Sequence, residues 1–552
     1  MTHQARHHTH ILAPAALLAL ATLLVSTFAA AAATPTRSAA GPRYGGTVEV
    51  AYTSDATSFD PAQAYSVDWY IMNGTLFNGL YQFDRNAKPQ LDLAAAAPTV
   101  SADQKTWTFQ LRKGVLFSNG MELTAGDVKY SIMRTLDPHL KPAASWGEFS
   151  EPPFVGASDF IAGKTKDVPG IQVLGPYTIR FVLTQPTALF PYIMAESFNM
   201  VVPKAVVSKE SEEAFNNNPI GTGPYILQSW TKGSKVVFVR NKHYFHTGKP
   251  YIDKIIVDLN TPSNLITLKI QKGEISGFGR PDQMSAADLQ QVKGDPKYAN
   301  WLKVTPVYTV DWLVANAKAV PTNNLKVRQA IAMAINRKRL VQLLGGQAIA
   351  AGNVYFPVDP QWDPALDVHP VYAYDPQSAS ATLKASGYKG QQVTLYFSND
   401  YSYESGMSLG LQQQLQQIGL NVNLHGVSHT SLIALHGKPN GAALSNDDWT
   451  PDYFDGYDIY SNLMSCSGSS GAGAGSYYCD PKADALVNQA STTPLGPARD
   501  ALLRQAQRRI LQSATMIPLI YVKSTEFVSP KVGGFYYLPL FGWQYENYWL
   551  NP

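Results

Sequence analysis

A strand, a helix and a second strand follow one another between residues 391 and 427, and this order constrains the fold more than any other feature of the sequence. The segment QQVTLYFS predicts a β-strand, LGLQQQLQQIGL predicts a helix with a glycine near its end, and NVNLHGV predicts a second strand. Strands joined through a helix pair in parallel, because a parallel pair needs a long crossover connection. The chain is therefore predicted to be of the α/β class.

Other segments predict a mixture of strands, hairpins and helices. Residues 45–62 predict a strand that leaves into a turn at Asp60-Pro61. KTWTFQLRKGVLFSNG predicts a hairpin that breaks at Asn119-Gly120, and Thr124 is placed as the N-cap of the helix that follows. NNLKVRQAIAMAINRKRLVQLL predicts one helix that ends at Gly345-Gly346. Since 552 residues exceed one ordinary core, we predict a mixed α/β protein with at least two lobes.

The first 33 residues predict a secretory signal peptide, 1–33. They combine a weakly basic start, an apolar run from Ile11 to Phe28 and small residues at 31–33. An uncleaved membrane anchor is the alternative, because the run approaches the length that spans a bilayer. No cysteine lies near its end, which argues against a lipid anchor. We expect an exported protein, in the periplasm or at the cell surface. The formal charge of +3 gives no indication of a nucleic acid partner.

The chain has two cysteines, Cys466 and Cys479, on either side of SGSSGAGAGSYY. In an exported protein, two cysteines around a flexible loop predict one disulfide bond. Two free thiols are the alternative. A zinc site is poorly supported, because two further ligands are missing.

Two glycine-containing motifs do not support the chemistry that they suggest at first. GMSLG (406–410) fits the nucleophile elbow of a hydrolase, but a polar run separates it from the preceding strand and no histidine follows His436. We therefore expect Ser408 near a helix start. GTGPY (221–225) lacks the lysine of a phosphate-binding loop, so its glycines predict a tight crossing between elements. The histidines outside the leader have no clustered ligand partner, and we predict packing or surface roles, no metal site and no cofactor.

The segment DDWTPDYFDGYD, residues 447–458, holds five aspartates among four aromatic residues. Its acids lack the alternating spacing and closing glutamate of a calcium loop. Asp452 and Asp455 could be the carboxylate pair of a glycosidase, although spacing within a loop does not give their separation in space. A solvated acidic turn is the remaining alternative.

Several motifs occur in one order across nearly the whole mature chain. They are GGTVEVA with SFDPA; the block at 78–134 from NGLYQFD to YSIMR; NPIGTGPYILQSW with RNKHYF; VRQAIAMAINRKRLV; and YDPQSASATLKASGY. In this order they resemble the family 5 extracellular solute-binding proteins of ATP-binding cassette importers, the oligopeptide- and dipeptide-binding group.

The resemblance implies a two-lobed periplasmic-binding-protein type II fold, α/β with mixed sheets, an extra domain and a hinge between the lobes. The implied limits are lobe I, residues 34–78, 201–275 and 517–552; extra domain, residues 79–200; lobe II, residues 276–516. Such a protein would be a monomer that binds a peptide in the cleft between its lobes. It would deliver the peptide to membrane permease subunits, and it would not be an enzyme.

The resemblance also implies a ligand site. In peptide-binding members, an aspartate in a W-x-x-D motif meets the ligand's α-ammonium, and WTPD places Asp452 at that position, with Trp449 and Tyr453 beside it. A buried ammonium requires a partner, and a carboxylate supplies one. Tyr65 and Ser66, after SFDPA, are implied as further ligand contacts. The loop between the two cysteines matches a disulfide-bearing loop of dipeptide-binding relatives.

One departure bears on the ligand's length. Dipeptide-binding relatives hold the ligand's carboxylate with an arginine just after the strand that corresponds to VTLYFS, and this chain has SNDYSYES there. We therefore expect oligopeptides rather than strictly dipeptides. An oligosaccharide binder is the main alternative, because aromatic residues make up 11% of the chain and could stack on sugars. A nickel-complex or haem-precursor binder and a signalling receptor are further alternatives.

Overall fold

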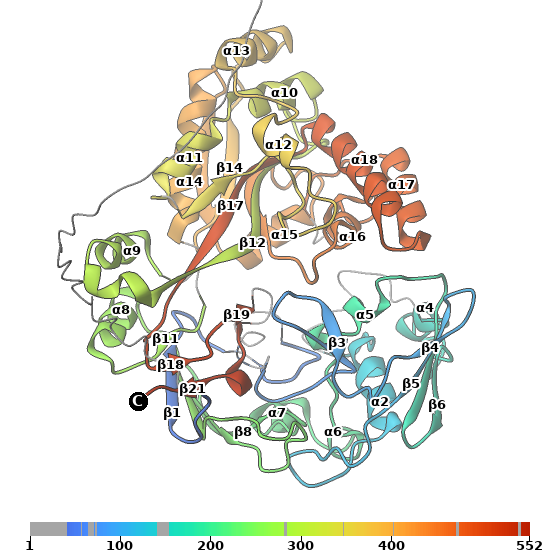
Figure 1. Cartoon of the computed structure of the whole chain (residues 1–552). Helices are drawn as coiled ribbons and strands as arrows, with labels where there is room; N and C mark the ends of the chain where they lie inside the picture. Colours follow the sequence, from blue (N-terminus) through green and yellow to red (C-terminus); the bar gives the residue numbers. More distant parts are fainter. Residues whose placement is uncertain are drawn as a thin grey trace, which may run out of the picture. The chain divides into compact units, whose positions relative to one another are not determined.

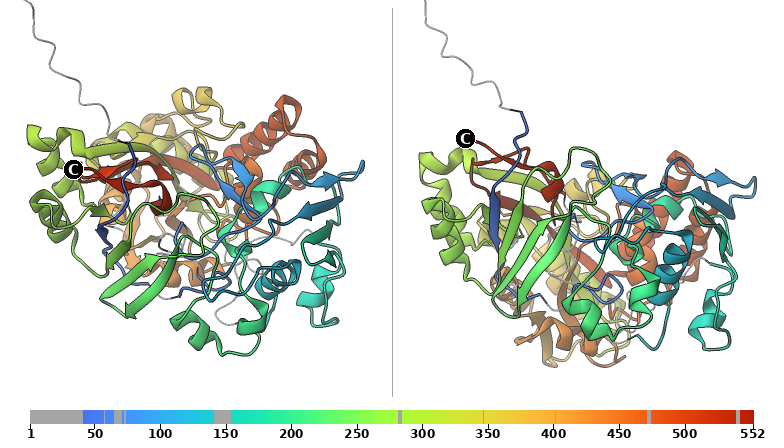
Figure 2. Two further views of the ribbon diagram at one scale, coloured as in Figure 1. Left: turned by 60° about the horizontal axis from the view of Figure 1, so that its bottom comes forward. Right: turned by 90° about the horizontal axis from the view of Figure 1, so that it is seen from below.

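The computed structural model describes most of the chain after residue 40 (Figures 1 and 2). The described residues are 41–56, 58–64, 71, 74–140, 154–280, 284–345, 347–400, 402–470, 474–538 and 542–552. The predicted signal peptide, 1–33, lies outside them. Within the described residues, no helix is both long enough and apolar enough to cross a membrane.

A five-stranded sheet has the order β11-β1-β10-β9-β8. Its strands are β1 (Thr47–Ala51), β8 (Tyr225–Thr231), β9 (Lys235–Arg240), β10 (Lys254–Asp258) and β11 (Gly277–Phe278). β1 pairs in parallel with β10 and β11, whereas β9 is antiparallel to both of its neighbours. The strand predicted within 45–62 is confirmed, and the chain turns at residues 61–63 as expected.

The GTGPY motif forms the tight crossing that its glycines predict. A Cβ atom on Gly221 would lie 2.0 Å from the carbonyl oxygen of Leu76, and one on Gly223 would lie 2.4 Å from the carbonyl oxygen of Thr75. Only glycine fits where two backbones approach this closely.

A four-stranded antiparallel sheet, in the order β4-β5-β7-β6, packs with helix α2. The elements are β4 (Thr99–Val100), β5 (Thr106–Gln110), β6 (Ile171–Gly175), β7 (Thr178–Val182) and α2 (Ala125–Thr135). Thr124 is the N-cap of α2, as predicted, and its backbone N–H donates to Asp127 Oδ2 at 2.9 Å. Gly120 takes a positive φ of 86° at the predicted hairpin break.

A six-stranded sheet has the order β13-β17-β12-β16-β14-β15. Its strands are β12 (Leu302–Ala315), β13 (Ala348–Ala350), β14 (Val393–Ser398), β15 (Val422–Val427), β16 (Leu444–Trp449) and β17 (Met516–Phe527). β14 and β15 pair in parallel with helix α14 (Ser402–Gln417) between them, which confirms the strand–helix–strand prediction.

Helices cover both faces of the six-stranded sheet (Figure 1). Along β12, Val310, Trp312 and Val314 pack in one cluster with α17 (Pro481–Thr492) and α18 (Pro497–Ser513). Leu313 and Ala315 pack in another cluster with α10 (Leu325–Ala334), α11 (Arg337–Leu343), α13 (Pro376–Ala385) and α14. Alternate residues of a strand face opposite sides of the sheet, so β12 presents apolar residues to the helices on both faces, with the buried Asp311 among them.

β12 and β17 form a long two-stranded ribbon that links the two large sheets (Figure 1). The ribbon runs from the pair Leu302–Phe527 to the pair Val314–Met516. Phe527 packs in one cluster with Ala51 of β1, and Val314 packs with the helices of the six-stranded sheet.

Two local predictions were wrong. The helix predicted between residues 323 and 344 is two helices, α10 (Leu325–Ala334) and α11 (Arg337–Leu343). Ile335 is extended, and the side chain of Asn336 accepts a hydrogen bond from the backbone N–H of Arg339, so it caps the second helix. Ser408 lies inside α14 and is fully buried, rather than near a helix start.

The remaining elements are short. The helices are α4 (Ala157–Ile161), α5 (Phe190–Ile193), η1 (Ser197–Asn199), α6 (Lys204–Val207), α7 (Glu212–Asn217), α8 (Ser263–Lys272), α9 (Ala286–Lys293), η3 (Pro296–Trp301), α12 (Pro364–Val368), α13 (Pro376–Ala385), α15 (His429–His436), α16 (Gly456–Ile459), η4 (Tyr460–Met464) and η5 (Tyr545–Asn547). The strands are β2 (Tyr81–Phe83), β3 (Pro89–Leu91), β18 (Val532–Gly533), β19 (Tyr537–Leu538), β20 (Gly542–Trp543) and β21 (Trp549–Leu550). The residue after β17, Val528, forms an antiparallel bridge with Gly277 of β11.

Candidate ligand-binding site

The acidic loop, residues 447–458, begins in the last residues of β16, a central strand of the six-stranded sheet. β16 pairs with β12 on one side and with β14 on the other, and the chain leaves the sheet after Trp449. Tyr453 and Phe454 are buried in the cluster around the four-stranded sheet, and the ring of Tyr453 lies 6.1 Å from that of Tyr192. The loop is therefore held by residues of two different sheets.

Asp452 is buried, with 6% of its surface exposed. Its backbone N–H donates to Asp458 Oδ2 at 2.9 Å, whereas its own Oδ1 has no hydrogen-bond partner among the described residues. Burial raises the pKa of Asp452 from 3.8 to about 7. A buried carboxylate without a donor is unfavourable. An ionised Asp452 therefore requires a partner that brings N–H donors.

Two further buried carboxyls interact with Asp452. Asp458, in α16, is 1% exposed, and burial followed by the charge of Asp452 raises its pKa well above the usual value. Glu196, between α5 and η1, is 3% exposed, and both of its carboxyl oxygens lack a partner in the described part of the chain. Burial, followed by the charges of Asp452 and Asp458, raises the pKa of Glu196 well above its usual value. Acids from separate segments thus meet at this site, and burial together with their mutual repulsion favours their protonated forms.

Asp455, the other acid of the glycosidase alternative, is fully paired. It is 4% exposed and accepts two hydrogen bonds from Arg499, which is 1% exposed, at 2.6 and 2.7 Å. It also caps α16 by accepting from the backbone N–H of Tyr457 at 2.9 Å. Bidentate Arg–carboxylate pairs are strong and directional. Asp455 therefore holds the loop in place, and its oxygens are already engaged.

Of the other predicted site residues, Trp449 is half-buried against the apolar cluster that contains α17 and α18, and Tyr453 is 7% exposed. Both lie near Asp452 in sequence. Burial, followed by the charge of Asp458, raises the pKa of Tyr453. Tyr65 and Ser66 lie outside the described residues.

A second acidic group lies in the six-stranded sheet where dipeptide-binding relatives are expected to carry an arginine. The backbone N–H of Ser398 donates to Glu404 Oε2 at 2.9 Å. Asp311, on β12, is fully buried, and burial followed by the charge of Glu404 raises its pKa. Asp447 is 9% exposed and lies 3.5 Å from His436, and burial raises its pKa to about 6. Residues 398–405 include no basic side chain.

These positions correct one part of the sequence prediction and agree with the packing role that it allowed for His436. A solvated acidic turn is wrong for Asp447, Asp455 and Asp458, because all three are buried. His436 is buried as well: its ring nitrogen Nε2 lies 2.9 Å from Ser445 Oγ, and burial lowers its pKa to about 4.

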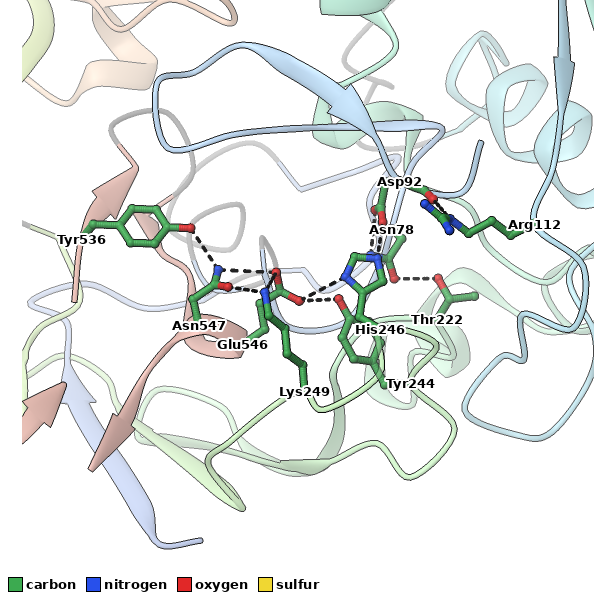
Figure 3. A network of polar contacts seen from close by, with 10 residues as sticks. All are labelled: Asn78, Asp92, Arg112, Thr222, Tyr244, His246, Lys249, Tyr536, Glu546 and Asn547. Atoms are coloured by element: carbon green, nitrogen blue, oxygen red, sulfur yellow. Dashed lines mark hydrogen bonds and ion pairs between the residues drawn. The ribbon is translucent and has the colours of Figure 1, made fainter. Parts of the chain in front are cut away.

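A polar network lies beside Glu196 (Figure 3). Asp92 accepts a hydrogen bond from Asn78 Nδ2 at 2.8 Å and lies 3.1 Å from His246 Nε2. His246 Nδ1 lies 3.8 Å from Glu546 Oε2. The further members of the network are Arg112, Thr222, Tyr244, Lys249, Tyr536 and Asn547. Asp92, Glu546 and Glu196 line one cavity of about 40 Å³.

Cys466 and Cys479 are joined in a disulfide bond, as the sequence predicts. The bond closes the glycine- and serine-rich segment that follows the acidic loop and η4. Across the described ranges, no three His, Cys, Asp or Glu side chains are arranged to hold a metal ion.

The fold and the site define a class of protein. Two large sheets, each packed with helices and linked by a two-stranded ribbon, are typical of two-lobed periplasmic binding proteins, and the buried acids form a candidate ligand site. A solved structure supports this class. The ABC transporter-associated periplasmic binding protein DppA from Helicobacter pylori, in complex with the peptide STSA, is similar to this chain with a TM-score of 0.78 and 24% identity, over 92% of this chain and 98% of that one. The predicted two-lobed fold is confirmed.

The chain belongs to the bacterial extracellular solute-binding proteins, family 5, whose sequence profile matches residues 88–471. It is 27% identical to the glutathione-binding protein GsiB of Shigella dysenteriae, over 91% of this chain and 94% of the relative. It is 28% identical to di/tripeptide-binding protein 1 of Pseudomonas aeruginosa, over 84% and 86%. The family and these relatives are binding proteins, so the chain is a binding protein and not an enzyme, which overturns the glycosidase alternative.

The sequence analysis missed Glu196, Arg499 and the polar network around His246. A signal for Glu196 exists, since it is the only charged residue between Leu189 and Val202 and therefore an acid in an otherwise apolar and neutral stretch. Such an acid is seldom buried without a partner.

Proposed function

We propose that this chain captures peptides by their free amino terminus and that Asp452 is the carboxylate that receives the ligand's α-ammonium. The unpartnered Oδ1 of Asp452, in a side chain that is 6% exposed, is the observation that carries the proposal. An ammonium brings both the positive charge and the N–H donors that this oxygen lacks. The names of the relatives agree, because glutathione, di- and tripeptides and the peptide STSA are all peptides.

The proposed ligands are oligopeptides rather than strictly dipeptides. The stretch 398–405 offers no cation for a carboxylate at the length of a dipeptide, and Glu404 and Asp311 would repel one. A longer peptide would place its carboxylate elsewhere and be held by main-chain hydrogen bonds. Trp449, Tyr453, Tyr65 and Ser66 are the further proposed contacts, with aromatic rings that exclude water and attract the cation.

The proposed setting is an ATP-binding cassette importer. The protein is exported with removal of residues 1–33, acts as a monomer outside the cytoplasm and delivers its ligand to membrane permease subunits. Lobe I (34–78, 201–275 and 517–552), the extra domain (79–200) and lobe II (276–516) are the proposed moving parts. The pairing of β12 with β17 supports a hinge there, because these two strands connect the two large sheets.

Calorimetric titration of the mature protein with tri- to pentapeptides tests the proposal. Asp452→Asn should weaken binding by at least a hundredfold, because leaving one charge of a buried pair without its partner costs about 3–5 kcal/mol. N-acetylation of the peptide, which removes the positive charge, should weaken binding to the wild type by a similar factor.

Asp159→Asn is the matched control. The side chain of Asp159 is 56% exposed and pairs with the exposed Lys164, so this variant should bind as the wild type does. Unchanged affinity in Asp452→Asn, or tight binding of N-acetylated peptides, would remove Asp452 as the anchor. Binding of oligosaccharides or nickel chelates in place of peptides would overturn the proposed ligand class.

A further inference from the structure

The turn between α5 and η1 places unpaired acceptor atoms beside the proposed anchor. Glu196 Oε1 and Oε2 have no hydrogen-bond partner in the described part of the chain, and neither has Asp452 Oδ1. The two side chains are 3% and 6% exposed, and their segments are in contact, because the rings of Tyr192 and Tyr453 lie 6.1 Å apart. Two buried carboxyls from distant segments therefore contribute three oxygens without donors.

Glu196 lacks hydrogen-bond donors in the described part of the chain, whereas the other carboxyls that line the same cavity have them. Asp92 and Glu546 line the same cavity as Glu196. Asp92 has Asn78 and His246 as partners, and Glu546 has Tyr244 and Lys249 (Figure 3). Of these three carboxyls, Glu196 is thus the one whose oxygens have no hydrogen-bond partner among the described residues.

We propose that Glu196 is a second carboxyl for the ligand's amino group and that, together with Asp452, it makes the site specific for primary over N-alkylated amines. A primary ammonium has three N–H donors, which equals the number of unpaired oxygens. N-methylation removes one donor and places a methyl group against a buried carboxylate, which leaves an acceptor unsatisfied. This inference rests on the proposed function, because it concerns the same amino group.

The position of Glu196 adds a consequence for closure. Glu196 belongs to the segment that leads from the four-stranded sheet, whereas Asp452 follows a strand of the six-stranded sheet. Bringing two carboxylates together away from water is unfavourable unless a cation lies between them. Without a ligand, protonation relieves this repulsion, as the raised pKa of Glu196 indicates. In the proposed complex, the ligand's ammonium lies between the two carboxyls and takes that role.

Calorimetry with trialanine and N-methyl-trialanine tests the inference in the wild type, Glu196→Gln and Asp452→Asn. The wild type should prefer trialanine by at least tenfold. Glu196→Gln should bind trialanine about ten- to hundredfold more weakly, which is the range for loss of a hydrogen bond to a charged group. The same variant should retain less than a threefold preference between the two peptides. Asp159→Asn should keep both the wild-type affinity and the preference.

Each outcome decides between the two proposals. If Asp452→Asn loses trialanine but Glu196→Gln keeps wild-type affinity and preference, the role of Glu196 is overturned and the proposed function stands. If the wild type binds both peptides equally, the inference fails. This outcome depends on no variant, so it holds even if a variant does not fold. If the wild type binds no trialanine, or Asp452→Asn binds it as tightly as the wild type, the proposed anchor fails and the role of Glu196 fails with it.

Discussion

Asp452 is expected to increase ligand affinity at the expense of stability, because a buried carboxyl without a partner destabilises the ligand-free protein. Asp452→Asn preserves the shape of the side chain and removes its charge. Burial raises the pKa of Asp452 from 3.8 to about 7 in the folded protein, and unfolding returns it to about 3.9. A shift of roughly three units, at about 1.4 kcal/mol each, corresponds to about 4 kcal/mol. We expect Asp452→Asn to raise the free energy of unfolding by up to that amount above pH 7.

The pH dependence of this effect has one direction. Between about pH 4 and pH 7 the folded protein binds more protons at Asp452 than the unfolded chain does, so its stability falls as the pH rises through this window. Below about pH 4 both states are protonated and the penalty is absent. The difference in unfolding free energy between the wild type and Asp452→Asn should therefore be largest above pH 7 and smallest near pH 4.

Urea titrations of the ligand-free proteins at pH 7.5 and pH 4.5, followed by tryptophan fluorescence and circular dichroism, measure this difference. Asp455→Asn is the matched control, because the same substitution in the same loop removes the partner of Arg499. It should lower the free energy of unfolding by about 3–5 kcal/mol. If Asp452→Asn is destabilised at pH 7.5 as much as Asp455→Asn, Asp452 is a structural residue and the reasoning is refuted.

Two further predictions concern stability. Reduction of the bond between Cys466 and Cys479, which are 13 positions apart, should lower the free energy of unfolding by about 3 kcal/mol, because loop closure in the unfolded chain is lost. Equal urea midpoints with and without dithiothreitol would contradict this. Gly223→Ala should destabilise the protein by at least about 1–3 kcal/mol, because its Cβ would lie 2.4 Å from the carbonyl oxygen of Thr75. Gly175→Ala, where no atom lies within 4 Å of the new Cβ, is the control, and equal thermal midpoints for the two variants would refute the argument.

Elements whose signal lies within one segment were predictable. The strand–helix–strand unit of β14, α14 and β15 follows from local periodicity, and the crossing at GTGPY follows from its glycines. The break between α10 and α11 was missed, although Asn336 is a good N-cap residue in the middle of an apolar pattern. The ribbon of β12 with β17 was not predictable in this way, because its partners, 302–315 and 516–527, are far apart in sequence.

The five aspartates of the acidic loop show why a site is harder to predict than a fold. All five are the same residue type, so the sequence alone does not distinguish them. Their roles depend on partners outside the loop. Asp455 is neutralised by Arg499, 44 positions later, and Asp458 by none of the described basic side chains. The W-x-x-D resemblance selected Asp452, but Glu196, whose pKa burial and then the charge of Asp452 raise, comes from another part of the chain and gave no such motif.

Charge pairing among the described residues also explains why the same short loop contains both a paired carboxyl, Asp455, and an unpaired one, Asp452. The pair of Asp455 with Arg499 fixes the course of the loop and the start of α16 in the absence of any ligand. Tyr453 and Phe454, which follow Asp452 directly, are buried in the cluster around the four-stranded sheet and hold this part of the backbone as well. Protonation removes the cost of the unpaired charge at low pH, and in the proposed site the ligand's cation removes it above pH 7. The paired Asp455 would thus position the loop in which Asp452 is the proposed anchor.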